Sequence, residues 1–453
     1  MKLLIKNAAY LITMNKQREI ISDAALLVED GIITAIGRTE QLGRSSFQPD
    51  ETIDADQGIV MPGLINAHIH TNQQLARGLG DGVYYPTYTK ERVGKYEEIL
   101  CPEEAYVASL CAGLEAVKSG TTCLIDTAAV HYKQAERAIS DLGIRAVLHK
   151  SADKPLLEEK NDPEAIAEIA DTVRSYGRRK GSLIRPGIAV QTITAHNEYL
   201  LQLNDLRKQL GLSLSVDMAV YYTTLNRHKE LYMGQLPMER WAELGALSSS
   251  TILNHLNCPT MEDQELLLSS GAKVVHCLTA GFGLGLGALY GPHLKLMKKG
   301  VVVAVGTASS AAGGSGDLFK AAFSLGAHRD FQEDATLLPP EKILEMLIIN
   351  GARCAGWDDE IGSLEQGKAA DLIIIKPDGP EWIPIHNPLS NLFFSGSSRN
   401  VKAVIVGGRI IMADRVLKTI NEKEVLEEAQ ARGIALLERS GLDQAAATSW
   451  PIY

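Results

Sequence analysis

Residues 61–70 read Met-Pro-Gly-Leu-Ile-Asn-Ala-His-Ile-His, a short apolar run that ends in two histidines one residue apart. In an extended strand, alternate side chains point to the same face, so the imidazoles of His68 and His70 are expected on one side. At the end of a barrel strand, such a pair offers two nitrogen ligands to a divalent metal ion. The pattern therefore predicts a metal site, and the alternative is a pair of buried histidines satisfied by hydrogen bonds.

Further runs rich in Val, Ile and Leu follow along the chain, separated by amphipathic helical stretches. Such runs are typical of parallel strands that are buried on both faces. With the first run included, they are Gly63–His68, Thr121–Asp126, Arg145–Lys150, Gly187–Ile193, Leu212–Met218, Thr251–Asn257, Lys273–Leu278 and Val301–Thr307. Eight such units predict a (β/α)8 TIM barrel, an α/β fold whose chemistry lies at the carboxyl ends of the strands. A doubly wound open sheet is the alternative, but no Gly-x-Gly-x-x-Gly turn follows an early strand.

Both ends of the chain contain alternating, strand-like patterns that are too short to form separate domains. These patterns are Leu3–Thr13, Ala24–Gly37, Ala370–Ile375 and Val401–Met412. We therefore expect residues 1–59 and 365–420 to form one small composite β-sandwich around a barrel of residues 60–364. Residues 421–453 are expected to form a C-terminal helix and tail.

Composition narrows the class of protein. A chain of 453 residues with 45% hydrophobic content can bury a large core. A net charge of -10 without acidic blocks argues against nucleic acid or an anionic membrane surface as a partner. The six cysteines form no Cys-x-x-Cys pair, and no signal-peptide pattern or membrane-spanning apolar run is present. We expect a cytoplasmic homo-oligomer that acts on a small-molecule substrate.

Scaffold motifs continue over almost the whole chain. They include Ile-Val-Met-Pro-Gly at 59–63, Lys-Ser-Gly-Thr-Thr at 118–122, Asn-Gly-Ala-Arg at 350–353 and Gly-Lys-Ala-Ala-Asp-Leu at 367–372. With these motifs and His-Ile-His, the chain resembles the amidohydrolase superfamily, in particular the branch of atrazine chlorohydrolase, melamine deaminase and the S-adenosylhomocysteine deaminases. The resemblance implies a metal-dependent hydrolase that acts on a carbon–nitrogen bond, or on a halide or amine substituent, of a small cyclic nitrogenous compound. It implies one divalent ion, with zinc expected first and iron or manganese as alternatives.

Several strand ends depart from what this resemblance implies. Asp217 stands where the family has a metal-binding histidine after strand five, and Val220 stands where it has a proton-shuttling glutamate. Ala308 stands where strand eight of the family ends in an aspartate that binds metal and accepts a proton from water. Ala280 and Gly281 replace the Ser-Asn that usually follows strand seven. The sequence therefore predicts a rebuilt catalytic site.

The predicted site is drawn from the residues that remain. A catalytic zinc needs three protein ligands and an open position for water, and carboxylate oxygen can serve beside imidazole. The predicted metal ligands are His68, His70, His255 and Asp217, and the predicted catalytic residues are His255, Asp217 and His276. Histidines are candidates for proton transfer because they titrate near neutrality, and His131 is a further one. The alternative for Asp217 is a structural role, as a polar strand-end residue that bonds to a neighbouring backbone amide. The alternative for His276 is a packed strand-end residue without a catalytic role.

Other segments near the predicted barrel mouth have two readings. The tyrosines at 84–88 and 221–222 can stack on a flat heterocycle or form the packing surface of a lid. Arg77 can bind an anionic group or pair with an acid, and the second, structural role is favoured. The glycine-rich stretch 281–287 has no lysine or Ser/Thr for a metal-bound phosphate, so it is not a P-loop.

Two classes of function follow. The retained histidines favour a metal-dependent hydrolase with a rebuilt site. Val220, Ala280-Gly281 and Ala308 instead favour a catalytically silent barrel that serves as a binding or assembly subunit. A non-hydrolytic enzyme that uses the same pocket is a third case. Since fold similarity cannot restore a missing catalytic residue, weak or absent deamination of adenosine-type and triazine substrates is expected.

Overall fold

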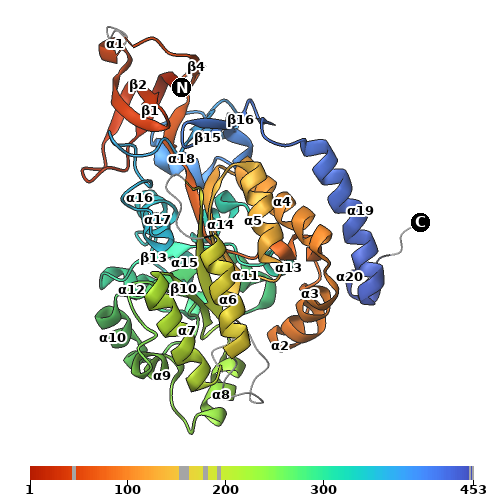
Figure 1. Ribbon diagram of the computed structural model, residues 1–453. Coiled ribbons are helices and arrows are strands. Elements are labelled where there is room, and N and C mark those ends of the chain that lie inside the picture. Colours follow the sequence, from red (N-terminus) through yellow and green to blue (C-terminus); the bar gives the residue numbers. More distant parts are fainter. Residues whose placement is uncertain (43–46, 153–162, 177–181, 191–194, 448–449, 451–453) are drawn as a thin grey trace.

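The computed structural model describes residues 1–453 except 43–46, 153–162, 177–181, 191–194, 448–449 and 451–453. A barrel occupies the centre of the molecule, with helices around it and a separate sheet at one end (Figure 1). The barrel strands are β6 (Leu64–Ile69), β7 (Thr121–Ala129), β8 (Arg145–Ser151), β9 (Ile184–Val190), β10 (Leu214–Met218), β11 (Thr251–His255), β12 (Lys273–His276) and β13 (Val303–Val305).

The eight strands are parallel and lie in space in their order along the chain. The last strand returns to the first, because the backbone oxygen of His68 accepts hydrogen bonds from the backbone nitrogens of Thr307 (3.0 Å) and Ala308 (2.9 Å). This closure confirms the predicted barrel and excludes the open sheet. The observed strands overlap the predicted runs, although the fourth run, Gly187–Ile193, ends outside the described residues.

Helices surround the barrel and line its mouth. Those of seven or more residues, apart from the C-terminal helix, are α4 (Pro102–Lys118), α5 (Tyr132–Leu142), α6 (Pro163–Ser175), α7 (Asn197–Leu210), α8 (Tyr222–Leu231), α9 (Pro237–Glu243), α10 (Met261–Ser270), α14 (Leu318–Ser324), α16 (Pro340–Leu347), α17 (Ile349–Ala355) and α18 (Pro388–Phe394), together with η2 (Tyr88–Gly94) and α11 (Leu278–Leu284). Shorter helices elsewhere along the chain are α1 (Thr39–Leu42), η1 (Thr71–Ala76), α2 (Tyr85–Thr87), α3 (Lys95–Ile99), η3 (Ala288–Tyr290), α12 (His293–Lys298), α13 (Ser310–Gly313), α15 (Ala327–Phe331), η4 (Pro380–Trp382) and η5 (Ser398–Asn400).

Local sequence explains where the long helix α4 begins. Pro102 occupies the first turn, where no backbone donor is needed, and the Glu104 side chain accepts a hydrogen bond from the backbone nitrogen of Cys101 (3.0 Å). Buried Ala, Val and Leu side chains along α4 then pack on the barrel. These features fix α4 as one wall of the region where the functional residues gather.

The two ends of the chain share one nine-stranded sheet, as expected for the composite unit. Its strands are β1 (Lys2–Ile12), β2 (Ile20–Glu29), β3 (Ile32–Arg38), β4 (Glu51–Asp54), β5 (Ile59–Pro62), β14 (Leu372–Ile375), β15 (Val401–Val406), β16 (Arg409–Ala413) and β17 (Val416–Leu417). The join is the antiparallel pair β5–β14, in which Pro62 lies opposite Leu372 and Ile59 lies opposite Ile375. An apolar strand from each end of the chain is therefore needed to complete the sheet.

A buried ion pair ties this sheet to the barrel. The Arg145 Nε atom lies 2.7 Å from Asp371 Oδ2, and Arg145 Nη2 lies 3.1 Å from Asp371 Oδ1. The side chains are 7% and 2% exposed, and the backbone nitrogen of Gly407 also donates to Asp371 (2.8 Å). Such two-pronged geometry holds the first residue of β8 against the residue that precedes β14.

The C-terminal helix α19 (Glu422–Ser440) runs along the outside of the barrel beside α3 and α4, and the short α20 (Asp443–Ala446) follows it (Figure 1). An ion pair fixes each end of α19, between Lys118 and Glu422 (2.6 Å) and between Glu104 and Arg439 (2.8 Å). Among the described helices, none is long and apolar enough to cross a lipid bilayer.

Candidate active site

The ends of three barrel strands bring the predicted ligands together. The rings of His68 and His70 at the end of β6 have centroids 4.8 Å apart, and the His68 ring lies 5.4 Å from that of His255 at the end of β11. Asp217 of β10 places Oδ1 3.8 Å from His68 Nε2. All four side chains are buried. The four residues predicted as metal ligands therefore converge at the carboxyl end of the barrel, where this fold carries its chemistry.

The donor atoms fit a divalent ion such as zinc. Two ligands of one zinc ion lie at most about 4.2 Å apart, because each bond is about 2.1 Å long. The His68–Asp217 separation of 3.8 Å meets this limit, and the ligand atoms of His68, His70 and Asp217 lie within 4.8 Å of one another. A second set within the same limit is His68, His255 and Cys277. His68 belongs to both sets, so an ion beside His68 could take its other ligands from either set.

Unsatisfied polar atoms point to the same position. Nε2 of His68 and Nδ1 of His255 are buried, and neither has a hydrogen-bond partner among the described residues. Buried polar atoms without a partner are uncommon and often mark the place of an ion or a water molecule. The other nitrogen of His68, Nδ1, lies 3.0 Å from the Thr127 hydroxyl, which orients the ring so that Nε2 is presented to the site.

Burial keeps these imidazoles neutral, which is the form that binds metal. Burial lowers the pKa of His70 to about 4 and, with the neighbouring histidines, lowers the pKa of His255 to about 3. The same causes hold the pKa of His68 well below its usual range. Burial also raises the pKa of the Cys277 thiol well above its ordinary value. The histidines are thus ready as ligands, whereas Cys277 would have to lose a proton.

The Asn254 side chain holds Asp217 at the barrel mouth. Asn254 Nδ2 donates to Asp217 Oδ1 (3.0 Å) and to the Ser215 hydroxyl (3.0 Å). The carboxylate is 8% exposed and lies on the wall of the cavity at the barrel mouth. In this position the Asp217 carboxylate could bind a metal ion or accept a proton from water, so both roles of Asp217 stay predictions.

This cavity is small, and its described wall residues include no lysine or arginine. Its volume is about 90 Å³, which is room for about three water molecules at roughly 30 Å³ each. Among the described residues its wall contains His70, Gln73, Tyr85, Tyr88, Thr89, Val93, Glu97, Asp217, His255, Ala280, Leu284, Leu286, Ala308, Ser309 and Ala312. A flat ring would need the tyrosines to move aside, since drug-sized ligands occupy about 300–1,000 Å³. Tyr85 and Tyr88 thus lie where both predicted roles, stacking and closure, are possible.

Two positions where this chain lacks the carboxylates that the resemblance implies, Ala308 and Val220, lie in apolar surroundings or present an apolar side chain. Ala308 lines the cavity, so its methyl group lies where the resemblance expects a carboxylate. Val220 is 1% exposed and belongs to an apolar cluster with Tyr88 and Leu284. Neither position can bind metal or carry a proton.

Strained backbone marks the strand ends at the barrel mouth. Ala128, Ala219, His255 and Ala308 have φ angles of 60°, 48°, 68° and 55°. L-residues enter this left-handed region at a cost of about 1–3 kcal/mol, and such residues cluster at functional sites. In this chain they lie at the ends of β7, β10, β11 and β13, next to the converging ligands.

The structure places His276 among other histidines and outside the wall of the small cavity. Its side chain is fully buried and does not line the cavity. The ring stacks on His293 with centroids 3.8 Å apart, and its Nε2 atom lies 2.9 Å from Nε2 of His328. Burial and the neighbouring histidines hold the pKa of His276 well below its usual range. This packing favours the alternative of a packed strand-end residue, and the catalytic role of His276 stays a prediction.

Other polar side chains of the barrel mouth have structural partners. His131 Nε2 contacts the backbone oxygen of Leu100 (2.7 Å), which leaves it away from the cavity. Arg77 pairs with Glu115, with Nη2 and Oε2 2.5 Å apart, as the favoured structural role predicted.

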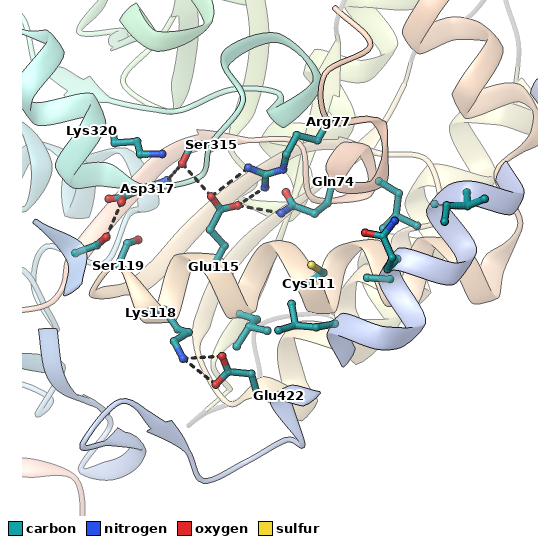
Figure 2. A pocket seen from close by; sticks show the side chains of 18 of the residues that line it. Gln74, Arg77, Cys111, Glu115, Lys118, Ser119, Ser315, Asp317, Lys320 and Glu422 are labelled. Carbon is teal, nitrogen blue, oxygen red and sulfur yellow. Dashed lines mark hydrogen bonds and ion pairs between the residues drawn. The ribbon is translucent and has the colours of Figure 1, made fainter. Parts of the chain in front are cut away.

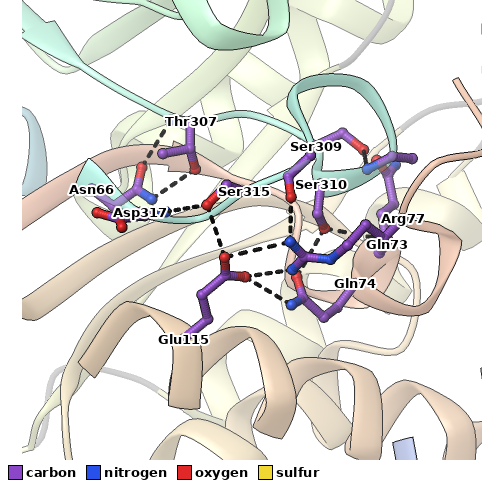
Figure 3. Close-up of polar contacts among 12 residues, drawn as sticks. Asn66, Gln73, Gln74, Arg77, Glu115, Thr307, Ser309, Ser310, Ser315 and Asp317 are labelled. Carbon is purple, nitrogen blue, oxygen red and sulfur yellow. Dashed lines mark hydrogen bonds and ion pairs between the residues drawn. The ribbon is translucent and has the colours of Figure 1, made fainter. Parts of the chain in front are cut away.

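Glu115 is the centre of a polar network that fixes the loop after β13 (Figure 3). Its carboxylate accepts hydrogen bonds from Gln74 Nε2 (2.9 Å) and the Ser315 hydroxyl (2.9 Å), besides the contact with Arg77. The Ser310 hydroxyl in turn donates to Gln74 Oε1 (2.8 Å). The loop that carries Ala308 is therefore anchored to η1 and α4.

A larger cavity of about 730 Å³ lies on the outer side of this network, under α19 (Figure 2). Two ion pairs lie in its wall, between Arg77 and Glu115 and between Lys118 and Glu422, and Asp317 accepts a hydrogen bond from Ser398 (2.6 Å). The candidate ligands His70, Asp217 and His255 lie elsewhere, in the wall of the small cavity.

Sequence reasoning missed two residues of the small cavity, Gln73 and Glu97. Gln73 Nε2 donates to Glu97 Oε1 (2.7 Å), and both side chains line the cavity with Asp217. Glu97 lies on α3, a five-residue helix without a recognisable motif. Its place at the site results from tertiary packing, which the sequence pattern does not reveal.

Known proteins resemble this chain over nearly its full length. A 5-methylthioadenosine/S-adenosylhomocysteine deaminase from Halothermothrix orenii is 30% identical over 94% of this chain and 97% of its own. A 5'-deoxyadenosine deaminase from Methanosarcina mazei is 30% identical over 96% and 99%. The crystal structure of an adenosine deaminase from Xanthomonas campestris with bound zinc superposes with a TM-score of 0.89 at 25% identity, over 97% of this chain and 98% of that one. Residues 59–411 match the amidohydrolase family. The chain therefore belongs to the amidohydrolase family.

Proposed function

We propose that the protein is a metal-dependent hydrolase that replaces an amino or halide substituent of a small nitrogenous ring with a hydroxyl group. The observation that carries the proposal is the convergence of three neutral imidazoles and one carboxylate on a buried cavity, with His68 Nε2 and His255 Nδ1 left without partners among the described residues. The named relatives are deaminases of adenosine-type compounds, which supports hydrolysis of a non-peptide carbon–nitrogen bond.

The proposed metal ligands are His68, His70, His255 and Asp217, and zinc is the expected ion. Three nitrogens and one oxygen make an acceptable zinc set, and the structurally similar adenosine deaminase carries zinc. When bound, such an ion lowers the pKa of a coordinated water to about 7. The chain's own part is to orient the imidazoles through Thr127 and to hold Asp217 where it can accept a proton from the attacking water.

The position of the carboxylate supports the rebuilt site. The family resemblance implies a ligand carboxylate after strand eight and a histidine after strand five. This chain has Ala308 at the first position and Asp217 at the second, and Asp217 reaches within 3.8 Å of His68 Nε2. A carboxylate is thus retained beside the histidines, although it comes from β10 instead of β13.

Turnover of ordinary family substrates should be slow, because Val220 has replaced the glutamate that shuttles protons. The test is to load purified protein with zinc, manganese or iron and to measure ammonia and chloride release from amino- and chloro-substituted purines and triazines. Activity that depends on added metal and is lost in Asp217→Asn supports the proposal. The combined substitution Ala308→Asp, Val220→Glu and Asp217→His should raise deamination. Absence of turnover in the metal-loaded parent, on every ring tried, would favour the silent binding subunit.

Two other features of this proposal are open to direct measurement. The identity of the ion is checked by elemental analysis of protein purified without chelator. The expected homo-oligomer in the cytoplasm is checked by light scattering during size-exclusion chromatography and by cell fractionation.

A further inference from the structure

We infer that Asn254 is a positioning residue for the proposed metal centre and that it acts on the centre through Asp217. The inference rests on the proposed function and adds a residue to it. Asn254 directly precedes the proposed ligand His255, and it lies opposite Asp217 where β10 pairs with β11. Its amide nitrogen donates to Asp217 Oδ1 at 3.0 Å. A neutral donor on the adjacent strand therefore fixes one oxygen of the proposed ligand.

Asn254 belongs to a buried polar layer that crosses the interior of the barrel. The layer consists of Thr127, Ser215 and Asn254, and all three side chains are fully buried. The Asn254 amide donates to the Ser215 hydroxyl (3.0 Å), which lies 3.2 Å from the Thr127 hydroxyl. The Thr127 hydroxyl lies 3.0 Å from His68 Nδ1. Polar contacts therefore run without a break from one proposed ligand, Asp217, to another, His68.

The layer lies one step deeper in the barrel than the proposed ligands. Ser215 precedes Asp217 by two residues on β10, so the two side chains point to the same face of the strand. Thr127 comes from β7, which is not adjacent to β10 in the sheet. The contact between Ser215 and Thr127 therefore spans the barrel interior and supports the ligands from below.

The chemistry of its neighbours fixes which way the Asn254 amide faces. A carboxylate that binds metal is ionised and can only accept hydrogen bonds, so the Nδ2 end must face Asp217. The Oδ1 atom is buried and has no hydrogen-bond partner among the described residues. A buried polar atom in this state has a desolvation cost. The amide is therefore costly to the fold, and its contacts are made by the end that holds Ser215 and Asp217.

A carboxylate at this position gains from such a donor. Rotation about the Cβ–Cγ bond of an aspartate is broad, so a donor bound to Oδ1 narrows the directions of both oxygens. In the observed orientation Asp217 Oδ1 lies 3.8 Å from His68 Nε2, which suits two ligands of one zinc ion. Loss of the donor would widen the range of orientations, and fewer of them would reach an ion beside His68.

The test measures the Kd for zinc by competition with a chromophoric chelator and needs no substrate. Asn254→Leu keeps the approximate volume of the side chain and removes the donor. Its Kd should rise by about 10- to 100-fold, which is the usual effect of removing a partner of a metal ligand. Asn257→Leu is the matched control, because Asn257 is also buried and its amide donates to the backbone oxygen of Val220 (3.0 Å). The Kd of the control should stay within about twofold of the parent, as for independent sites.

A double-mutant cycle separates positioning from a general structural role. Asp217→Ala leaves three histidines, which are enough to hold zinc. In that background Asn254→Leu should change the Kd by less than about twofold, because the route through Asp217 is absent. A structural effect on the neighbouring ligand His255 would instead weaken binding equally in both backgrounds. Asn254→Ala takes the place of Asn254→Leu in the cycle if circular dichroism shows that the leucine variant does not fold.

The outcomes separate this inference from the proposed function. If the parent binds no divalent ion, the proposed function fails and the role of Asn254 fails with it. If the parent binds zinc and Asn254→Leu binds it as tightly, the inference alone is overturned. Equal losses with and without Asp217 would also overturn it, since Asn254 would then act through the fold and not through the carboxylate.

Discussion

Removal of His68 and His70 is the most direct perturbation of the proposed metal centre. The double substitution His68→Ala and His70→Ala leaves His255 and Asp217 from the proposed set, and two ligands are fewer than zinc sites in proteins use. At free zinc a hundred times Kd, binding stabilises the parent by about 2.7 kcal/mol. The unfolding entropy of a 453-residue chain is about 0.95 kcal/mol/K, so saturating zinc should raise the parent Tm by about 3 °C.

The assay records Tm with and without zinc for each protein, together with elemental analysis after dialysis. Comparing each protein with itself removes the cost of deleting two buried rings, which lowers Tm independently of metal. His386→Ala is the control, because His386 is exposed and distant from the barrel mouth in sequence. We expect a zinc-dependent shift in the parent and the control and none in the double variant. Equal metal content and equal shifts in the double variant would refute the assignment of these ligands.

Three further predictions concern residues outside the metal centre. Arg145→Met leaves the buried Asp371 carboxylate without its charged partner, so the free energy of unfolding in urea titration should fall by about 3–5 kcal/mol. A loss under about 1 kcal/mol would contradict the stabilising role of this ion pair. Burial raises the pKa of Glu115, but Arg77 and the other hydrogen-bond donors lower it by a larger amount. The pKa of Glu115 in the folded protein therefore lies below its usual value. The stability that Glu115 contributes is present above about pH 4.5 and lost as the pH falls through the folded pKa. Glu115→Gln should therefore cost about 1 kcal/mol at pH 7 and progressively less below pH 4.5, as measured by unfolding across pH. His276→Gln should change kcat/KM by less than about threefold per folded molecule, whereas a hundredfold loss would restore its catalytic role.

The barrel and the first two proposed ligands were predictable because their signals are local. Short apolar runs separated by helices identify the strands, and the alternation of side chains along β6 places His68 and His70 on one face. The composite sheet was predictable for a similar reason, since each end of the chain has strands that cannot be stable alone.

The polar partners that decide function were not predictable from local pattern. Glu97 meets Gln73 across 24 residues, and His276 meets His328 across 52 residues. Such pairs depend on how α3 and α15 pack, and neither helix carries a motif. Cys277 was not predicted as a possible ligand, because its approach to His68 depends on the curvature of the barrel.

The left-handed backbone at Ala308 bears on how readily a carboxylate could be introduced at the end of β13. Among L-residues, Asp and Asn enter this region more easily than most, so an aspartate would fit the existing φ of 55° without a change of main chain. One substitution would therefore place a carboxylate there. Val220→Glu costs more stability, since Val220 is 1% exposed in an apolar cluster where a glutamate would bury its charge. Of these two substitutions, the one at Ala308 is the easier for the fold to accept.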